Sequence, residues 1–312
     1  MTMADAVPDY APLCAAPDRH PHAPRAAFPA FACDTHAHIF GPAARFPYVR
    51  ERIYTPPDST YEDYRHLLAA LGVERAVLVQ PSVYGDDNAA MLAAMKRFGA
   101  GVRAVAVTAP DISTPQIEAM HRAGVRGLRF NVVDRRDNKN IVPTDMLRDI
   151  ARRVAPFGWH IELLVNVDEA PRLGQALADI PVPVVLGHLG YPKSGARNWP
   201  AHPAFGDLLR LLEGGRCWVK LTGPYRISDA PDVPYDDVDA AARKLIAAAP
   251  QRMIWGTDWP HPMKKKRMAN DGDMADLLER WAPDARMRAR ILADNPAELY
   301  GFAPGERIPA AG

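Results

Sequence analysis

A regular alternation of short apolar runs with longer stretches of helical spacing most constrains the fold of this chain. Each apolar run is short enough to be a strand buried on both faces of a parallel sheet. The pattern begins near residue 30 and continues almost to the end of the sequence. We expect eight strands, over residues 31–33, 75–80, 103–107, 127–130, 159–165, 182–186, 217–221 and 253–255.

The stretches between these runs carry apolar residues at the spacing of amphipathic helices. Eight strands separated by helices in 312 residues favour a single (β/α)₈ TIM barrel. The rival fold is a doubly wound open sheet, which is disfavoured because no Gly-x-Gly-x-x-Gly turn follows an early strand. The expected helices span residues 61–71, 88–97, 115–122, 145–154, 171–178, 203–213 and 238–248.

The first part of the chain is different, because prolines interrupt any helical or strand period there. We therefore divide the chain into a loose Pro/Ala-rich arm over residues 1–29 and a barrel domain over residues 30–312. His20 and His22 lie in the arm at a spacing that resembles a metal-binding pair. With no rigid element to hold them, we interpret both as solvated.

Composition excludes several classes of function. The 38 basic residues nearly balance the 37 acidic ones, for a formal net charge of +1. Nothing in this balance indicates a nucleic-acid groove or a basic membrane surface, so we expect neither partner. Cys14, Cys33 and Cys217 are widely separated, and we interpret them as reduced thiols of a cytoplasmic protein. No apolar stretch is long enough to cross a membrane, and the sequence leaves a homo-oligomer open.

Titratable and polar residues cluster where several expected strands end. The pentapeptide 34–38 (DTHAH) follows the first strand, and later strands lead into residues 187–188 and 256–261. In a barrel the C-terminal ends of all strands face one mouth, where active sites lie. The side chains that we expect to converge there are His36, His38, Arg129, His188, Arg226 and Asp258.

These residue types fit the hydrolysis of an ester or lactone, which needs a base for water and a group that polarises the carbonyl. Asp258 is the candidate base, and we expect partial burial to raise its pKa toward a useful range. His36, His38 and His188 are the candidate polarising groups, acting as hydrogen-bond donors or through a bound metal.

The motifs resemble the amidohydrolase superfamily, which combines an Asp-x-His-x-His after the first strand with a later His and a final Asp. The resemblance is to the amidohydrolase-2 branch that contains 2-pyrone-4,6-dicarboxylate lactonase, and it implies a distorted barrel of amidohydrolase type. It covers residues 30–302, with the matching segments HIFGP (38–42), RGLRFN (126–131), GHLG (187–190), WGTDWPH (255–261) and NPAELY (295–300).

Metal dependence is left as a choice between two mechanisms. A tetrahedral zinc site needs about four ligands, and His36, His38, His188 and Asp258 could supply them. The fifth strand, however, has its only histidine, His160, at its beginning, which is the wrong end of the barrel. The similar lactonase works without metal, so we favour no cofactor and keep a single Zn²⁺ or other divalent ion as the alternative.

Arginines near the mouth indicate an anionic substrate, since guanidinium groups bind carboxylates bidentately. The resemblance implies that Arg129, Arg135 and Arg226 bind substrate and that Tyr54 lies near its carbonyl. His261 is a further candidate for the substrate site, where it would either support Asp258 or make structural hydrogen bonds.

Two positions depart from the lactonase pattern. Leu164 stands where a substrate-binding Tyr is expected, and Tyr191 stands where an Arg is expected. We keep Tyr191 among the candidate substrate contacts, but the changes leave the lactone undefined: a 2-pyrone dicarboxylate, a muconolactone or a sugar-acid lactone.

The expected function is therefore a carboxylic ester hydrolase of aromatic or sugar-acid catabolism that opens a small anionic lactone. Three alternatives stay open: a sugar-acid lactone isomerase that uses the same site, a mononuclear zinc hydrolase such as one acting on a sulfonated muconolactone, and a binding protein on a barrel scaffold.

Overall fold

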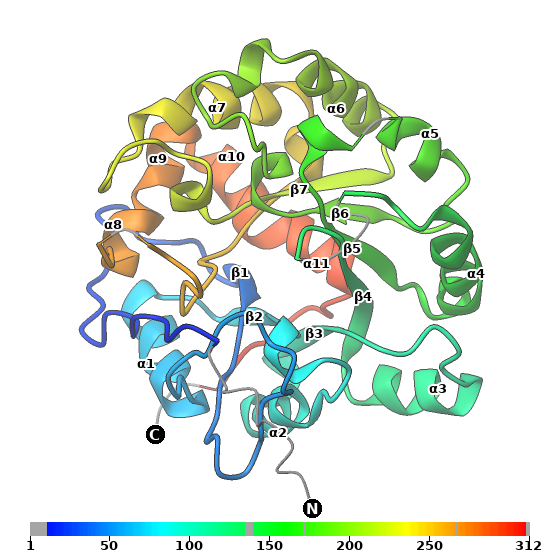
Figure 1. Ribbon diagram of the computed structural model, residues 1–312. Helices are drawn as coiled ribbons and strands as arrows, with labels where there is room; N and C mark the ends of the chain where they lie inside the picture. Colours follow the sequence, from blue (N-terminus) through cyan, green and yellow to red (C-terminus); the bar gives the residue numbers. More distant parts are fainter. Residues whose placement is uncertain (1–10, 135–139, 171, 266, 310–312) are drawn as a thin grey trace, which may run out of the picture.

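The computed structural model describes residues 11–134, 140–170, 172–265 and 267–309. Eight parallel strands pair in sequence order around a nearly closed barrel, which confirms the predicted TIM-barrel class (Figure 1). The strands are β1 (Cys33–Ala37), β2 (Arg75–Val79), β3 (Val102–Ala106), β4 (Val125–Asn131), β5 (His160–Leu164), β6 (Val184–Leu186), β7 (Cys217–Leu221) and β8 (Met253–Trp255).

The barrel closes through residues just beyond β8. Ala37 forms an isolated parallel bridge with Trp259. The His38 amide donates to the Trp259 carbonyl at 2.8 Å, and the Asp258 amide donates to the His36 carbonyl at 2.8 Å. The closure thus joins the two chain segments that carry three of the predicted site residues.

Asp34 stabilises this closure through hydrogen bonds. Its carboxylate accepts hydrogen bonds from the Thr257 amide at 2.9 Å and the Thr257 hydroxyl at 2.6 Å. The His36 amide and the Tyr64 hydroxyl donate to the same carboxylate at 3.1 and 2.9 Å. Because all four partners are donors, Asp34 works here as an acceptor that joins β1, α1 and the segment after β8.

Helices surround the barrel (Figure 1). In α1, for example, Tyr64, Leu67 and Leu71 are buried on one face, and Thr60 and Asp63 form a capping box at its start. The seven predicted helices are present within a few residues, and four short helices after β8 were not predicted. The helices are α1 (Tyr61–Leu71), α2 (Ala89–Phe98), α3 (Thr114–Arg122), α4 (Thr144–Val154), α5 (Leu173–Ala178), α6 (Pro203–Glu213), α7 (Asp239–Ala248), α8 (Asp271–Ala275), α9 (Leu277–Trp281), α10 (Ala285–Ala289) and α11 (Asn295–Tyr300).

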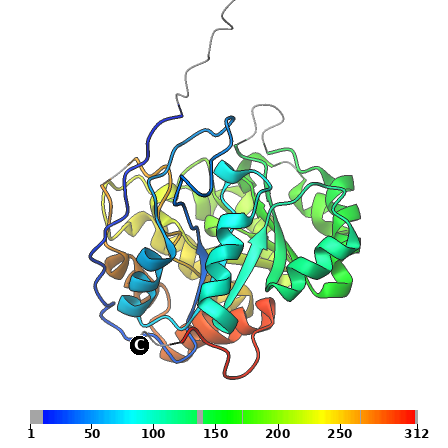
Figure 2. The same cartoon turned by 90° about the horizontal axis from the view of Figure 1, so that it is seen from below.

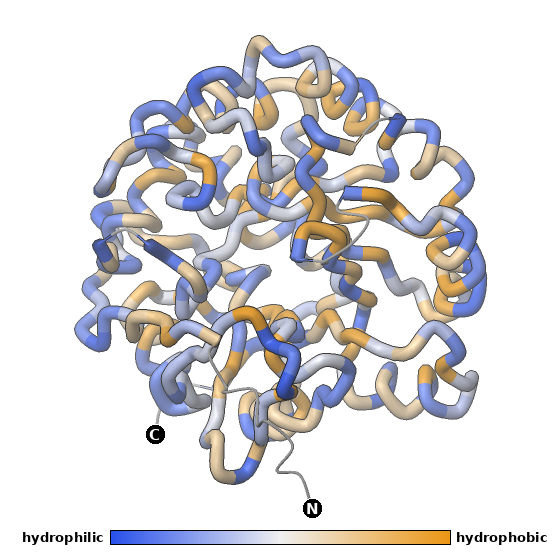
Figure 3. The backbone as a smooth tube through the Cα atoms, viewed as in Figure 1, coloured by the Kyte–Doolittle hydropathy of each residue, from blue (hydrophilic) through white to orange (hydrophobic). Residues whose placement is uncertain are grey.

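Helix α11 covers the end of the barrel that lies opposite the predicted mouth, where it is drawn in red in Figure 2. Tyr300 packs edge-on against His160, the first residue of β5, at a ring distance of 5.2 Å. Apolar segments gather in the central strands, and hydrophilic ones lie mostly on the outside (Figure 3). Helix α11 therefore covers this end of the barrel, and the predicted mouth lies at the other end (Figure 2).

The described part of the N-terminal arm, residues 11–29, is not loose. It passes beside α1 and α8 (Figure 1), where the Arg25 amide and Nε donate to the Asp276 carboxylate at 2.7 and 2.8 Å. The Asn270 side chain accepts from the His22 amide at 3.1 Å and donates to Asp18 at 2.9 Å. Prolines exclude regular structure here, but they leave the backbone free to bond to the barrel. The division at residue 29 stays a prediction.

Within the described residues, no helix is long and apolar enough to cross a membrane. The three cysteines have free thiols, as expected, and Cys33 and Cys217 are buried. The cytoplasmic location and the homo-oligomer stay predictions.

Candidate active site

The three predicted histidines lie together at the mouth of the barrel. His36 belongs to β1 and His38 follows it, so their side chains leave the strand on the same face. The His36 ring lies 5.0 Å from the His38 ring and 5.3 Å from the His188 ring. His188 comes from the loop after β6, where its backbone φ of 50° is left-handed. All three side chains are buried.

Asp258 completes the cluster from the loop after β8, and its two oxygens differ. Oδ2 accepts from the Tyr225 hydroxyl at 2.5 Å and from Arg226 Nε at 2.6 Å. Among the residues that the structure describes, Oδ1 has no hydrogen-bond partner, and it lies 3.5 Å from His36 Nε2 and 3.8 Å from His38 Nε2. One oxygen is thus held in place, and the other faces the histidines.

Our expectation that burial raises the pKa of Asp258 was wrong. Burial does act in that direction, but the Arg226 guanidinium outweighs it and holds the pKa below its usual value. Because its pKa is lowered, the Asp258 carboxylate is ionised throughout the neutral range. The sequence placed Arg226 at the mouth but did not predict that it pairs with Asp258.

The histidines are neutral. Burial lowers the pKa of His38 and of His188 to about 3, and it lowers the pKa of His36 well below its usual value. His38 Nδ1 lies 2.7 Å from the Val79 carbonyl, so this nitrogen must carry the ring hydrogen. His38 Nε2 consequently turns a lone pair toward Asp258 Oδ1. His188 Nδ1 lies 2.9 Å from the Thr222 hydroxyl.

Two of the three predicted arginines lie at this mouth. Arg129, in β4, donates from Nη1 to the Gln80 carbonyl at 2.9 Å, and its buried Nε has no partner within the described part of the chain. It lines a cavity of about 250 Å³ at the C-terminal ends of β2, β3 and β4. The Arg226 side chain is 15% exposed, so it reaches from Asp258 toward the opening. Arg135 lies outside the described residues, and its role stays a prediction.

Two predicted substrate contacts, Tyr54 and Tyr191, border the cluster. Tyr54 is buried and makes a hydrogen bond with Ser82, and burial raises the pKa of its hydroxyl to about 12. Tyr191 packs edge-on against His188 at a ring distance of 5.4 Å. Both positions are compatible with contacts to a ligand above the histidines.

His261 occupies a different place from the one expected of a substrate contact. Its side chain is fully buried, its Nε2 lies 3.0 Å from Asp271 Oδ1, and its ring packs against Tyr225. Tyr225 in turn donates to Asp258, so His261 supports the candidate base indirectly, through Tyr225.

Sequence reasoning missed four polar side chains beside the cluster: Glu162, Lys220, Thr222 and Tyr225. Lys220 Nζ lies 2.6 Å from Glu162 Oε2, 2.7 Å from the Thr35 carbonyl and 3.2 Å from His36 Nδ1. A charged residue inside an otherwise apolar strand was the available signal for Glu162 and Lys220. Thr222 and Tyr225 carried no comparable signal.

Gly223 permits the loop after β7 to pass between these groups. Its φ of 56° is left-handed, and a Cβ there would lie 2.8 Å from His188 Nδ1 and 3.0 Å from Asp258 Oδ2. Any side chain would therefore strain the backbone and displace two predicted catalytic residues.

Among the described residues, His36, His188 and Asp258 place three buried ligand atoms within 4.8 Å of one another, so this group could hold a metal ion. His38 is not part of the group, which leaves three of the four predicted ligands. The surroundings fit a metal poorly, because a ligating histidine normally donates its other N–H to an acceptor. His36 instead turns Nδ1 toward the ammonium of Lys220.

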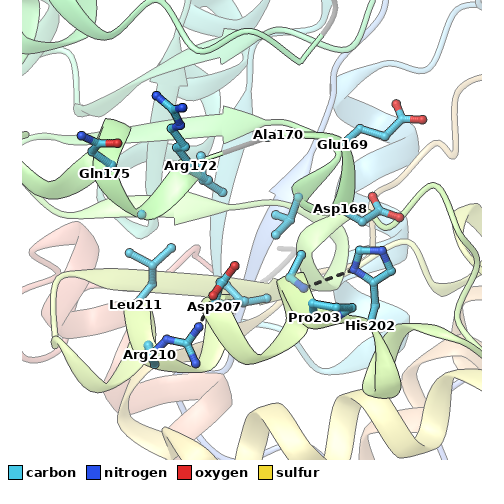
Figure 4. A pocket seen from close by; sticks show the side chains of 15 residues that line it. Asp168, Glu169, Ala170, Arg172, Gln175, His202, Pro203, Asp207, Arg210 and Leu211 are labelled. Carbon is cyan, nitrogen blue, oxygen red and sulfur yellow. Dashed lines mark hydrogen bonds and ion pairs between the residues drawn. The ribbon is translucent and has the colours of Figure 1, made fainter.

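A separate cavity of about 740 Å³ lies outside the barrel, beside α5 and α6 (Figure 4). Its lining includes Asp168, Arg172, His202 and the ion-paired Asp207 and Arg210. None of the residues that line it was predicted for the site. The histidine cluster therefore stays the candidate site.

A family model described as amidohydrolase matches residues 33–302. The chain belongs to the amidohydrolase family. A 4-sulfomuconolactone hydrolase of Hydrogenophaga intermedia is 37% identical over 96% of this chain and 98% of its own length. A 2-pyrone-4,6-dicarboxylate hydrolase of Comamonas testosteroni is 36% identical, over 90% and 93%. A D-galactarolactone isomerase of Agrobacterium fabrum is 31% identical, over 90% and 95%.

Solved structures share the fold of this chain. An apo structure from Agrobacterium tumefaciens is 29% identical and has a TM-score of 0.80, covering 90% of this chain and 99% of the other. An amidohydrolase from Burkholderia multivorans with bound zinc has a TM-score of 0.64 at 21% identity, over 88% and 100%, and shows the shared fold alone. The predicted membership of an enzyme family of amidohydrolases is confirmed.

Proposed function

We propose that this amidohydrolase opens a small anionic lactone with water that Asp258 activates. The observation that carries the proposal is the asymmetry of Asp258, whose Oδ2 is held by Tyr225 and Arg226 while Oδ1 faces neutral histidines. Two relatives whose names describe hydrolases of anionic lactones support the reaction class.

The attacking water is held between Asp258 Oδ1 and His38 Nε2. Both atoms are acceptors, and they lie 3.8 Å apart, so one water molecule can donate a hydrogen to each from just above them. The oxygen lone pair then points away from both acceptors, toward the substrate carbonyl. Asp258 removes a proton as the new carbon–oxygen bond forms.

The carbonyl oxygen gains negative charge in this step, and histidine N–H groups of His36 and His188 stabilise it. Collapse of the tetrahedral intermediate breaks the ring carbon–oxygen bond, and the ring oxygen leaves as a hydroxyl group with the proton from Asp258. The new carboxylic acid ionises, so one proton is released for each lactone opened near neutral pH.

Arg129 and Arg226 would bind the anionic groups of the substrate, with the cavity of about 250 Å³ beside Arg129 receiving the part remote from the carbonyl. A substrate carboxylate on Arg226 would also draw the guanidinium away from Asp258. The pKa of Asp258 would then rise, which makes it a stronger base when substrate is bound.

We infer that the reaction needs no metal. Two of the three candidate ligands already face cations, since Lys220 Nζ lies 3.2 Å from His36 Nδ1 and Arg226 Nε lies 2.6 Å from Asp258 Oδ2. A divalent cation would be repelled by both. The mononuclear zinc hydrolase is the alternative, and activity after chelation separates the two.

The decisive experiment is a proton-release assay on a panel of anionic lactones, with and without a chelator. Turnover that survives chelation supports the proposal, whereas loss of bound zinc together with activity would replace it with the zinc mechanism. No turnover of any lactone would contradict the function itself.

Replacing Asp258 with Asn tests the base. We expect kcat to fall by about 10³-fold or more, because Asn cannot accept a proton, while substrate still binds. Isothermal titration with substrate and the proton-release assay measure the two effects. Asp145→Asn, at a side chain that is 94% exposed, is the matched control for a carboxylate-to-amide substitution. An active Asp258→Asn enzyme would exclude Asp258 as the base.

An isomerase is the second candidate, favoured by the 31% identity to a D-galactarolactone isomerase. The same Asp258 oxygen would then deprotonate a substrate hydroxyl instead of water, and the acyl group would move within the molecule. Product analysis separates the two reactions, because isomerisation leaves the mass unchanged and releases no proton.

A further inference from the structure

Lys220 and Glu162 form an ion pair inside the barrel that the proposed reaction does not use. Lys220 is completely buried and Glu162 is 2% exposed, so neither side chain reaches a ligand. TIM-barrel interiors are normally packed with apolar side chains, and burying two charges is costly. The pair adjoins one catalytic candidate, His36, which suggests that its purpose lies there.

The hydrogen bonds of Lys220 determine which nitrogen of His36 carries the ring hydrogen. An ammonium group has three N–H donors and no acceptor. Two point at the Thr35 carbonyl and at Glu162 Oε2, at 2.7 and 2.6 Å, and the third is 3.2 Å from His36 Nδ1. Glu162 Oε1 lies farther from the same nitrogen, at 3.5 Å. Nδ1 therefore accepts from Lys220, and the ring hydrogen lies on Nε2.

His38 has the opposite tautomer. Its Nδ1 donates to the Val79 carbonyl, so its Nε2 is an acceptor. His36 in β1 and His38 just after it thus present a donor and an acceptor next to Asp258 Oδ1. The donor, His36, suits a contact with the oxyanion, and the acceptor, His38, suits binding of the attacking water.

We propose that Lys220, anchored by Glu162, is a positioning residue that fixes His36 as the Nε2–H tautomer. In this form His36 donates to the substrate carbonyl oxygen, and it cannot ligate a metal through Nε2. The catalytic consequence rests on the proposed lactone hydrolysis, but the tautomer itself can be measured without substrate.

The test is nuclear magnetic resonance of the full-length protein labelled with ¹⁵N in its histidines, with the signals of His36 assigned through His36→Asn. Long-range proton–nitrogen correlations distinguish the two neutral tautomers of each ring. We expect His36 in the wild-type protein to carry its hydrogen on Nε2. A hydrogen on Nδ1 would overturn the proposal.

The informative variant is the double substitution Lys220→Met and Glu162→Gln, which removes both charges and leaves no buried ion unpaired. With Lys220 gone, the carbonyl oxygen of the introduced glutamine side chain becomes the partner of Nδ1, and the hydrogen of His36 should move to that nitrogen. An unchanged tautomer would overturn the proposal. Asp271→Asn alters another buried histidine–carboxylate pair and should leave the His36 signals as they are.

Two further measurements separate a positioning role from a structural one. Zinc affinity, measured by competition with a chromophoric chelator, should rise at least tenfold in the double variant because Nε2 becomes a free ligand. With a substrate in hand, kcat should fall at least tenfold while KM changes little. Unchanged zinc affinity in a variant whose tautomer has moved would overturn the link to metal exclusion. Failure of the wild-type protein to open any lactone would contradict the proposed function and leave the tautomer result intact.

Discussion

At the scale of single residues, the Arg226–Asp258 pair sets the acidity of the site. Asp258 is completely buried, and burial alone would favour its protonated form. The guanidinium at 2.6 Å reverses that preference and lowers the pKa of the carboxylate. Arg226 thus keeps the proposed base ionised, but the lowered pKa also makes the carboxylate a weaker base.

Replacing Arg226 with Met should therefore move the acidic limb of the kcat/KM profile to higher pH. Asp258 acts as a base only when ionised, and without Arg226 the effect of burial raises its pKa. The wild-type protein should keep its activity well into the acidic range, and the variant should lose activity closer to neutrality. Arg126→Met is the control, since Arg126 donates to the backbone carbonyls of His121 and Val125 near the start of β4, away from the mouth. Identical acidic limbs in all three proteins would show that Arg226 does not tune Asp258.

At the scale of elements, the segment after β8 is tied to β1 by Asp34. The carboxylate accepts from Thr257, Tyr64 and the His36 amide, and Gly256 leaves room for it, since a Cβ there would lie 2.9 Å from Asp34 Oδ1. Burial raises the pKa of Asp34 to about 6 despite these donors. The hydrogen bonds of Asp34 thus keep His36 and Asp258 in fixed positions relative to each other.

Asp34→Asn should lower the free energy of unfolding by about 3 kcal/mol, because the amide NH₂ replaces an acceptor that faces buried donors. Urea unfolding at pH 7.5 measures the change. Asp145→Asn is the matched control, since the Asp145 side chain is 94% exposed and the substitution should alter stability by less than about 0.5 kcal/mol. A stable Asp34→Asn protein would mean that Thr257 and Tyr64 find other acceptors.

The elements also show how far the sequence could predict the structure. Strand positions were predictable because buried parallel strands leave compact apolar runs, although β1 lies at 33–37 and not at 31–33, so His36 is inside the strand. Helices α8 to α11 are five or six residues long, too short for a helical period to stand out.

For the site, residues at strand ends were predictable because a barrel brings these ends together. Lys220 and Glu162 were not predicted, because their meeting across the barrel depends on which face of β7 and of β5 turns inward. The pairing of Arg226 with Asp258 depends in the same way on loop geometry, which no spacing in the sequence specifies.

At the scale of the whole molecule, several buried neutral histidines make stability depend on pH. Burial lowers the pKa of His38, His160 and His188 to about 3, against an ordinary value of about 6.5 in the unfolded chain. Below about pH 6.5 the unfolded chain binds protons that the folded protein does not. Stability therefore falls as the pH drops, and Asp34, whose raised pKa acts in the opposite direction, offsets only part of the loss.

We expect each of these histidines to reduce the free energy of unfolding by about 2 kcal/mol between pH 7 and pH 5. Urea unfolding at a series of pH values measures the slope. His160→Gln, at the floor of the barrel and remote from the mouth, should remove one of these contributions and make the slope shallower. A free energy of unfolding that stays constant from pH 7 to pH 5 would contradict the neutral state of these rings.

The unequal oxygens of Asp258 also bear on stereochemistry. With Oδ2 fixed by Tyr225 and Arg226, the only free oxygen approaches a bound lactone from one side. The planar ester group would then show a single prochiral face to the incoming water, and the proposed contact with Arg129 would fix the orientation of the ring. The two enantiomers of a chiral lactone should therefore react at different rates at such a site. When a racemic lactone is supplied, one enantiomer should be hydrolysed and the other should remain, so that about half of the substrate is consumed.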